Sequence, residues 1–329
     1  MRPLPLALAT LLASAGGAFA APLDAFYSSF LTFGDSLSDN GNLFARTGQP
    51  APPYFEGRFS NGPVWAEEVA ARFAVSGNFA FGGANAATND DAVPDFGMQV
   101  DAFLASPLKD QAGARPLASV WFGANDLFDG IATGTTPAAI EGAIGAIGSG
   151  IETLRAAGVM DFVLFELPDL GATPLYNLII PQASSGATAA SLAFNAALSA
   201  YADGLTDSGA TVTYVETRAL FDDLLENPEP YGVTETTLPC LFLNGNADVQ
   251  AAAAAVAGAL SQPLVCDAAT AEERIFFDLV HPNADGHVAL AANVRGELEP
   301  VPAVPVPASL PLALGAVASL ALVRRRVAR

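Results

Sequence analysis

The sequence predicts an α/β fold in which a mainly parallel sheet is covered by helices on both faces. Short apolar stretches alternate along the chain with longer segments of helical character, an order typical of β-α-β units. The expected strands are continuously apolar, as strands buried on both faces are. Three of them end in Gly-rich polar turns, so a ligand site is expected at the carboxyl edge of the sheet.

Each expected strand is a short apolar run next to turn residues. The runs are Ser29–Phe33, Asn78–Phe81, Ala118–Phe122, Asp161–Leu167 and Thr211–Val215. The expected helices have apolar residues at helical spacing or are rich in Ala. They are Pro63–Phe73, Pro137–Ala157, Thr188–Leu205, Arg218–Leu225, Asp248–Leu260 and Asn283–Leu298. All these elements fall in one domain, residues 21–299, within which the segment 226–271 is expected to form an irregular insertion or cap.

The first 20 residues are typical of a secretory signal peptide. Arg2 precedes an apolar stretch, which ends in the small-residue sequence Ala18-Phe-Ala20. A cleavage site after Ala20 is therefore expected. The alternative is a buried first helix.

The C-terminal end predicts a second processing signal. A Pro-rich linker covers residues 300–308, and residues 309–329 hold an apolar run followed by a basic tail. The motif Val304-Pro-Val-Pro-Ala-Ser309 resembles the bacterial PEP-CTERM sorting signals of the VPxPA type. The resemblance implies a transmembrane segment that a sorting protease or transpeptidase recognises and cuts. The alternative is a plain tail anchor. Both ends together predict an exported protein, extracellular or at the cell surface, which is tethered to the membrane before this processing.

The composition indicates an acidic, folded protein. Hydrophobic residues make up 51% of the chain and charged residues 15%, which excludes an intrinsically disordered chain. Five of the 14 Arg and Lys lie in the end segments, whereas all 34 Asp and Glu lie between them, so residues 21–307 carry a net charge of −25. Such a surface repels nucleic acid, which is therefore not an expected partner.

The chain has two cysteines, Cys240 and Cys266. In an exported chain such a pair predicts a disulfide. The alternative is a pair of buried thiols. No His lies near them at ligand spacing, so no metal site is expected, and no cofactor is expected either.

The residues for nucleophilic catalysis lie near the two ends of the expected domain. A serine hydroxyl needs a base to take its proton, and His is the usual base. Ser36 follows the first expected strand. His281 is one of only two histidines, and Asp278 precedes it by three residues, a spacing that can bring the carboxylate to the imidazole in a turn. Taken singly, Ser36 could instead cap a helix and Asp278 could be a simple cap.

Several motifs, in order along the chain, resemble those of the SGNH or GDSL hydrolases. They are Gly34-Asp-Ser-Leu37, Gly57-Arg-Phe-Ser-Asn-Gly62, Asn78-Phe-Ala-Phe-Gly-Gly-Ala84, Gly123-Ala-Asn-Asp126, the block from Phe165 to Pro174, and Asp278-Leu-Val-His281. The resemblance implies a three-layer α/β/α sandwich with a mainly parallel five-stranded, flavodoxin-like sheet. It also implies a GDSL serine esterase or lipase.

The resemblance assigns roles to particular residues. Ser36 would be the nucleophile, His281 the general base and Asp278 the residue that orients it. The oxyanion would be held by the backbone N–H groups of Ser36 and Gly83 and by the side chain of Asn125. Gly82 is an alternative to Gly83. Three further residues are expected to have structural roles: Asp39 in the turn after Ser36, Asp126 beside Asn125, and His287 in the last helix.

The substrate is left open between lipids, short-chain esters and acetylated polysaccharide, with the segment 226–271 expected to set the acyl length. Two other functions are compatible with the motifs. One is a phospholipase or lipid acyltransferase of the same family. The other is a catalytically silent surface or matrix protein that keeps the fold.

Overall fold

Five strands form one sheet in the part of the chain that the computed structural model describes, residues 22–242 and 247–299. They are β1 (Ser29–Gly34), β2 (Ser76–Asn78), β3 (Pro116–Trp121), β4 (Asp161–Phe165) and β5 (Thr211–Val215). The strand order is β2-β1-β3-β4-β5, and every pairing is parallel. Every residue of β1, β3 and β4 is buried, because helices cover both faces. The predicted fold class is confirmed.

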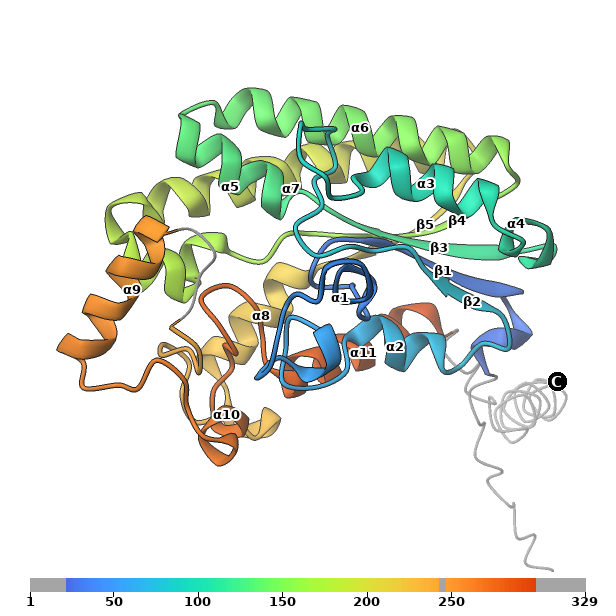
Figure 1. Ribbon diagram of the computed structural model, residues 1–329. Coiled ribbons are helices and arrows are strands. Elements are labelled where there is room, and N and C mark those ends of the chain that lie inside the picture. The colour runs from blue at the N-terminus through green and yellow to red at the C-terminus, as the bar shows by residue number, and fades with distance from the viewer. Residues whose placement is uncertain (1–21, 243–246, 300–329) are drawn as a thin grey trace, which may run out of the picture. The chain divides into compact units, whose positions relative to one another are not determined.

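The described residues form eleven α-helices, several of which cover the two faces of the sheet. The helices are α1 (Asn42–Thr47), α2 (Trp65–Ala70), α3 (Phe96–Ala105), α4 (Leu108–Gln111), α5 (Ala124–Thr133), α6 (Thr136–Ala156), α7 (Ser184–Asp207), α8 (Thr217–Glu226), α9 (Ala247–Ala259), α10 (Ala268–Glu273) and α11 (Ala284–Leu298). Figure 1 shows α3, α6 and α7 above the sheet and α2, α8 and α11 below it. The result is the expected three-layer sandwich.

The core on the lower face is aromatic. The Trp121 ring stacks on Phe165 with the ring centroids 4.8 Å apart, and Trp65 of α2 lies 4.7 Å from Phe165. These rings are fully buried. Aromatic pairs of this geometry stabilise a fold by about 1 kcal/mol beyond the burial of their area, so the middle of the sheet is a rigid base for the loops that leave it.

The sheet topology determines where a site can form. From β1 the chain goes to β2 on one side, and from β3 it continues to β4 and β5 on the other. Ligands bind to such sheets beyond the carboxyl ends of the strands at this switch point. Ser36 follows β1 and Asn125 follows β3, so two of the residues with expected catalytic roles start from neighbouring strands.

One local expectation is wrong, and one of the alternatives is excluded. The strand expected at Asn78–Phe81 is found at Ser76–Asn78, because the Asn78 side chain accepts a hydrogen bond from the Ala80 N–H and turns the chain out of the sheet. Ser36 does not cap a helix, since α1 begins only at Asn42 with Gly41 as its N-cap.

Candidate active site

Ser36 lies in a tight turn directly after β1. The Asp35 carbonyl accepts hydrogen bonds from the N–H groups of Ser38 and Asp39, and the Asp35 carboxylate accepts one from the Leu37 N–H at 3.0 Å. The turn is also held from the side by Gln99 of α3, whose amide donates to the Gly34 carbonyl and accepts from the Gly34 N–H. These contacts fix the backbone on both sides of the Ser36 hydroxyl.

His281 joins this turn to the C-terminal part of the chain. Its Nε2 lies 2.7 Å from Ser36 Oγ, and its Nδ1 lies 2.7 Å from Asp278 Oδ2. An ionised carboxylate can only accept, so Nδ1 carries the proton and Nε2 is left to accept the hydroxyl proton of Ser36. The three side chains are therefore arranged for proton transfer from serine to imidazole.

The spacing of three residues between Asp278 and His281 reflects a closed turn. The Phe277 N–H donates to the His281 carbonyl at 2.8 Å. Asp278 Oδ1 accepts from the N–H groups of Val280 and His281, at 2.9 and 2.8 Å. Burial raises the pKa of Asp278, but His281 and these hydrogen bonds outweigh it, so the pKa lies below its ordinary value. Asp278 therefore stays ionised beside the imidazole.

Three groups that could hold an oxyanion line the same cleft. Among the described residues, the N–H groups of Ser36 and Gly83 have no hydrogen-bond partner. Asn125 donates one amide hydrogen to the Ala84 carbonyl at 2.9 Å, which leaves its second amide hydrogen for a ligand. The Gly82 N–H is already bound to Asp39 Oδ2 at 2.8 Å. Of the two glycines, Gly83 is therefore the one with a free donor.

Buried carboxylates hold the loops of the site together. Asp39 accepts from the N–H groups of Gly41, Asn42 and Leu43 as well as Gly82. Asp126 accepts from those of Ala86 and Ala87. Burial raises the pKa of both carboxyls, although these hydrogen bonds oppose it. Both residues thus have structural roles in positioning the Gly82–Gly83 loop.

Two aromatic side chains of the site were not predicted. The Tyr54 hydroxyl donates to Asp278 Oδ2 at 2.7 Å, and the Phe59 ring lies 5.0 Å from the His281 ring. Phe59 belongs to a motif quoted above, whereas Tyr54 lies in a Pro-rich stretch with no pattern that signals it. His287 is structural: it is buried in α11, and its Nδ1 accepts from the Trp65 N–H at 3.4 Å. Burial lowers the pKa of His287 to about 3, so it is neutral.

The cleft above Ser36 has a volume of about 510 Å³. Its walls are mostly apolar, with side chains from the turn after β1, α1, the segment before α2, α5, the loops after β4, α8 and the segment before α11: Leu37, Leu43, Phe59, Phe128, Leu170, Leu175, Phe221, Leu225, Phe276 and Val280. Its acidic residues are Asp35, Asp169 and Asp222, of which the last two pair with Arg218. No Lys or Arg in the described part of the chain lines the cleft. None of the described residues of the segment 226–271 lines the cleft, so the expectation that this segment sets the acyl length is not supported.

Comparison with known proteins gives the family. Residues 30–294 match the sequence profile of the GDSL-like lipase/acylhydrolase family. The chain belongs to this family. The prediction of a carboxylic ester hydrolase is confirmed at the level of the family.

Three curated relatives of this GDSL chain have different names. It is 32% identical over 270 residues to the thermolabile hemolysin of Vibrio parahaemolyticus, a match that covers 80% of this chain but 62% of the hemolysin. It is 29% identical to the phosphatidylcholine-sterol acyltransferase of Aeromonas hydrophila, covering 80% of this chain and 88% of that protein. It is 28% identical to the acetylesterase of Thermothelomyces thermophilus, a match that covers 71% of this chain and 88% of the acetylesterase.

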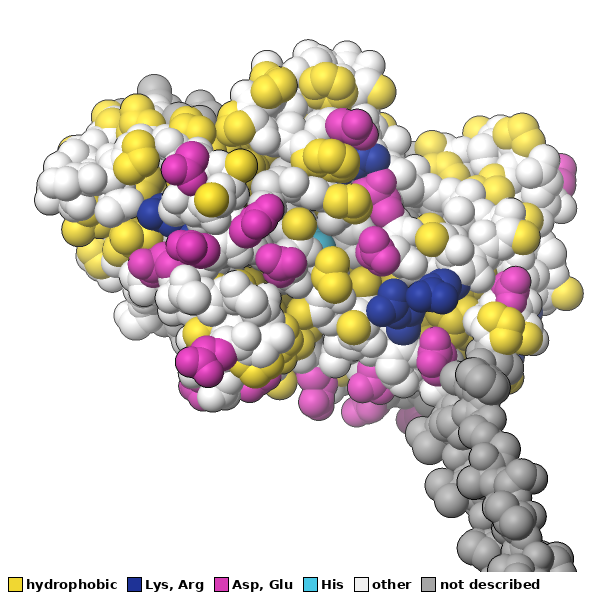
Figure 2. All heavy atoms as spheres, turned by 90° about the horizontal axis from the view of Figure 1, so that it is seen from below, with side chains coloured by type: hydrophobic (Ala, Val, Ile, Leu, Met, Phe, Trp, Pro, Cys, Tyr) yellow, Lys and Arg dark blue, Asp and Glu magenta, His cyan; other side chains and the backbone are white. Residues whose placement is uncertain are grey.

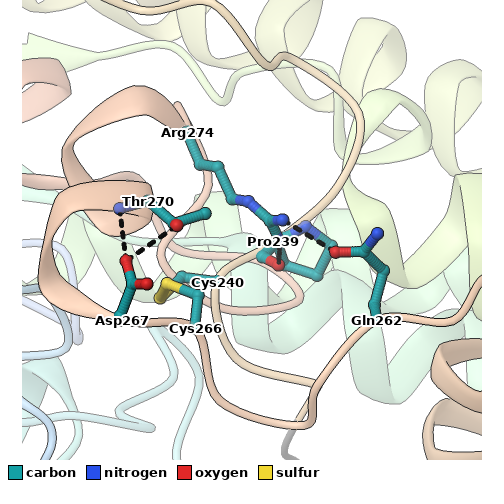
Figure 3. Close-up of a disulfide and its surroundings, with 7 residues drawn as sticks. All are labelled: Pro239, Cys240, Gln262, Cys266, Asp267, Thr270 and Arg274. Carbon is teal, nitrogen blue, oxygen red and sulfur yellow. Dashed lines mark hydrogen bonds between the residues drawn. A yellow bond between two sulfur atoms is a disulfide. The ribbon is translucent and has the colours of Figure 1, made fainter.

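The GDSL domain also contains a disulfide between Cys240 and Cys266. Figure 3 shows it beside Arg274, whose guanidinium donates to the Pro239 carbonyl and to Gln262. The residues around Cys240 pair with the segment before Asp278: the N–H groups of Cys240 and Leu241 donate to the carbonyls of Phe276 and Phe277, at 3.0 and 2.8 Å. We call the disulfide and the residues 238–242 and 262–277 around it the disulfide lobe.

The surface agrees with the acidic composition. Figure 2 shows acidic side chains spread over the face at the bottom of Figure 1, with basic side chains gathered at a few places. Within residues 22–242 and 247–299, no group of three or more His, Cys, Asp or Glu could hold a metal ion, and no helix is long and apolar enough to cross a membrane. The predicted signal peptide, linker and sorting segment lie outside the described residues and stay predictions.

Proposed function

We propose that this chain is an exported serine ester hydrolase that cleaves carboxylic esters through an acyl-enzyme on Ser36. One observation carries the proposal: the continuous hydrogen-bonded series from Ser36 Oγ through His281 to Asp278, with both distances at 2.7 Å. The free donors of Gly83 and Asn125 beside it support the same reaction. Export is supported by the predicted signal peptide and by the disulfide, since disulfides persist in oxidising compartments.

The proposed reaction has two steps. Ser36 Oγ attacks the ester carbonyl while His281 Nε2 takes the hydroxyl proton, and Asp278 stabilises the imidazolium. The N–H groups of Ser36 and Gly83 and the amide of Asn125 bind the oxyanion. The alcohol leaves with the proton from His281, and water activated by the same imidazole then releases the acid. An acceptor alcohol in place of water would give acyl transfer, the second candidate function, which the acyltransferase relative favours.

The cleft favours a neutral ester with an acyl group longer than acetyl. Apolar walls and a volume of about 510 Å³ are typical of sites that bury most of a drug-sized ligand. Among the described residues no Lys or Arg lines the cleft, and the neighbouring Arg218 is already paired with Asp169 and Asp222, so an anionic substrate has no free cationic side chain as a partner. Of the substrates left open by the sequence, this favours the lipids and longer esters, although the relatives' names include both a lipid acyltransferase and an acetylesterase.

A fluorophosphonate probe tests the nucleophile. We expect a single adduct on Ser36 of the folded protein, mapped by mass spectrometry, and none after denaturation. Ser36→Ala should lower kcat by about 10⁴-fold or more and leave the unfolding curve unchanged. The matched control is Ser106→Ala, because Ser106 lies at the end of α3 outside the cleft. This variant should be labelled on Ser36 and should hydrolyse esters like the wild type.

The result that would contradict the proposal is a folded protein that is neither labelled on Ser36 nor active on esters. The silent surface protein would then be the better interpretation. For the substrate, p-nitrophenyl esters from acetyl to dodecanoyl should show the highest kcat/KM beyond butanoyl. Product analysis with an added alcohol separates hydrolysis from acyl transfer.

A further inference from the structure

We propose that Tyr54 is a positioning residue for the reaction, acting through its hydroxyl on Asp278; this inference rests on the proposed function of Ser36, His281 and Asp278. Tyr54 lies 224 positions before Asp278 in the sequence, and its hydroxyl donates to Asp278 Oδ2 at 2.7 Å. Nothing in the motifs of the family resemblance includes this residue. The hydrogen bond is therefore a contact that the fold shows and that the motifs do not reveal.

The two oxygens of Asp278 are held in different ways. Oδ1 accepts from the N–H groups of Val280 and His281, which belong to its own turn. Oδ2 is the oxygen nearer to His281 Nδ1, at 2.7 Å against 2.9 Å for Oδ1, and Tyr54 is its other donor. The Tyr54 hydroxyl thus fixes the oxygen that faces the imidazole most closely.

The Tyr54 ring is itself held in place. It packs edge-on against Phe277, the residue before Asp278, with the centroids 5.4 Å apart. It also packs against Phe59 at 5.7 Å, and Phe59 in turn contacts the His281 ring. Burial and the charge of Asp278 raise the pKa of Tyr54 above its ordinary value, so the hydroxyl keeps its proton and remains a donor at every working pH.

Removing the hydroxyl changes Asp278 in two ways. The buried Oδ2 loses a donor, which is costly for a charged acceptor, and the carboxylate is less firmly oriented. Its negative charge is also less dispersed, so it attracts the protonated imidazole of His281 more strongly. The other titratable groups beside His281 are Asp35, from the turn after β1, and His287, from α11, and neither is altered by a change at Tyr54.

The test is Tyr54→Phe, which keeps the ring contacts and removes only the hydroxyl. We expect kcat/KM on a fluorogenic ester to fall roughly 10-fold and the acid limb of its pH profile to move to higher pH. The matched control is Tyr231→Phe. Tyr231 donates to Asp223 Oδ2 at 2.6 Å in the same kind of Tyr–Asp pair, but neither residue lines the cleft, so rate and pH profile should match the wild type.

A second background separates positioning from a general loss of stability. In Asp278→Asn, Tyr54→Phe should have little further effect on kcat/KM, because its route through the carboxylate is gone. An equal loss in both backgrounds without a shift of the acid limb, or wild-type kinetics in Tyr54→Phe, would overturn the proposal. These outcomes are distinct from failure of the proposed function, in which the wild type itself is not labelled on Ser36.

Discussion

The turn that carries Ser36 and the segment that carries Asp278 and His281 are stabilised in different ways. The Ser36 turn continues from β1, which lies inside the sheet between β2 and β3, and Gln99 holds its first residue by hydrogen bonds in both directions. The segment 274–282 lies outside the sheet. It is held by isolated bridges, such as Phe276 with Pro282, and by its hydrogen bonds to Cys240 and Leu241 in the disulfide lobe.

This difference indicates a division of work. The nucleophile and the oxyanion donors come from the ends of β1 and β3 and the loop after β2, so their geometry is as stable as the sheet. The acid–base pair depends on contacts between distant parts of the chain, namely the disulfide lobe and Tyr54. A substitution in the first region should therefore lower the catalytic rate of a folded protein. A substitution in the second region should let the segment with Asp278 and His281 lose its position before the sheet unfolds.

After Ser36→Ala, the largest effect in the sheet-based region is expected for Asn125→Ala. Loss of one oxyanion donor typically lowers kcat by about 10²–10³-fold, and the variant should stay folded because α5 begins before Asn125 and keeps its backbone. The matched control is Asn177→Ala, since the side-chain amide of Asn177 donates a similar hydrogen bond to the Ala172 carbonyl, at 2.8 Å, in an exposed place. Steady-state kinetics on a p-nitrophenyl ester check this. If Asn125→Ala loses stability and not rate, Asn125 is a structural residue.

Much of the sheet-based region could be predicted from sequence. β1, β3, β4 and β5 lie within about two residues of the expected runs. The buried strands β1, β3 and β4 consist mostly of apolar residues, whereas the partly exposed β5 alternates Thr with apolar residues. β2 was misplaced because the turn at Asn78 interrupts an apolar run that continues to Phe81. α5 was missed since it begins inside the Gly123-Ala-Asn-Asp126 motif, where Asn and Asp are poor helix formers.

In the second region the sequence predicts the catalytic residues themselves but not the residues that hold them in place. The short spacing of Asp278 and His281 is a local signal, so their pairing follows from the sequence. The Tyr54 hydroxyl reaches Asp278 only through the fold, and a Tyr in a Pro-rich stretch has no periodicity to reveal it. Gln99 was missed for a related reason: a buried amide inside an apolar helix has no signature until its backbone partner, Gly34, is known.

The disulfide lobe should respond differently from the sheet. Replacing both cysteines by serine is expected to lower the free energy of unfolding by about 3 kcal/mol on the chain-entropy model. Because Cys240 and Leu241 pair with Phe276 and Phe277, hydrolysis should be lost at a lower temperature than the far-UV circular dichroism signal. Activity and circular dichroism measured across one thermal scan give both midpoints. Coincident midpoints, as for the wild type, would mean that the lobe does not hold the acid–base segment.

The smallest effects concern two buried groups whose contributions to the free energy of unfolding change with pH in opposite directions. Burial lowers the pKa of His287 to about 3, so the stability that this residue contributes is complete above its unfolded value and is lost as the pH falls below about 6.5. Burial raises the pKa of Asp35 to about 7, so its contribution is complete at low pH and is lost as the pH rises toward 7. Between pH 7 and 5 the two therefore offset one another in the wild type.

Single substitutions should separate these two contributions. His287→Asn should be less stable at pH 7.5, since it leaves a cavity, but should gain about 2 kcal/mol relative to the wild type between pH 7.5 and 5. Asp35→Asn keeps an acceptor for the Leu37 N–H and should lose a similar amount over the same range. Urea unfolding at pH 7.5, 6 and 5 measures both slopes. Equal slopes for the two variants would show that neither group changes its proton affinity on folding. Opposite slopes would show that folding shifts the proton affinities of His287 and Asp35 in opposite directions, so that together they keep the stability of the wild type nearly constant over this range.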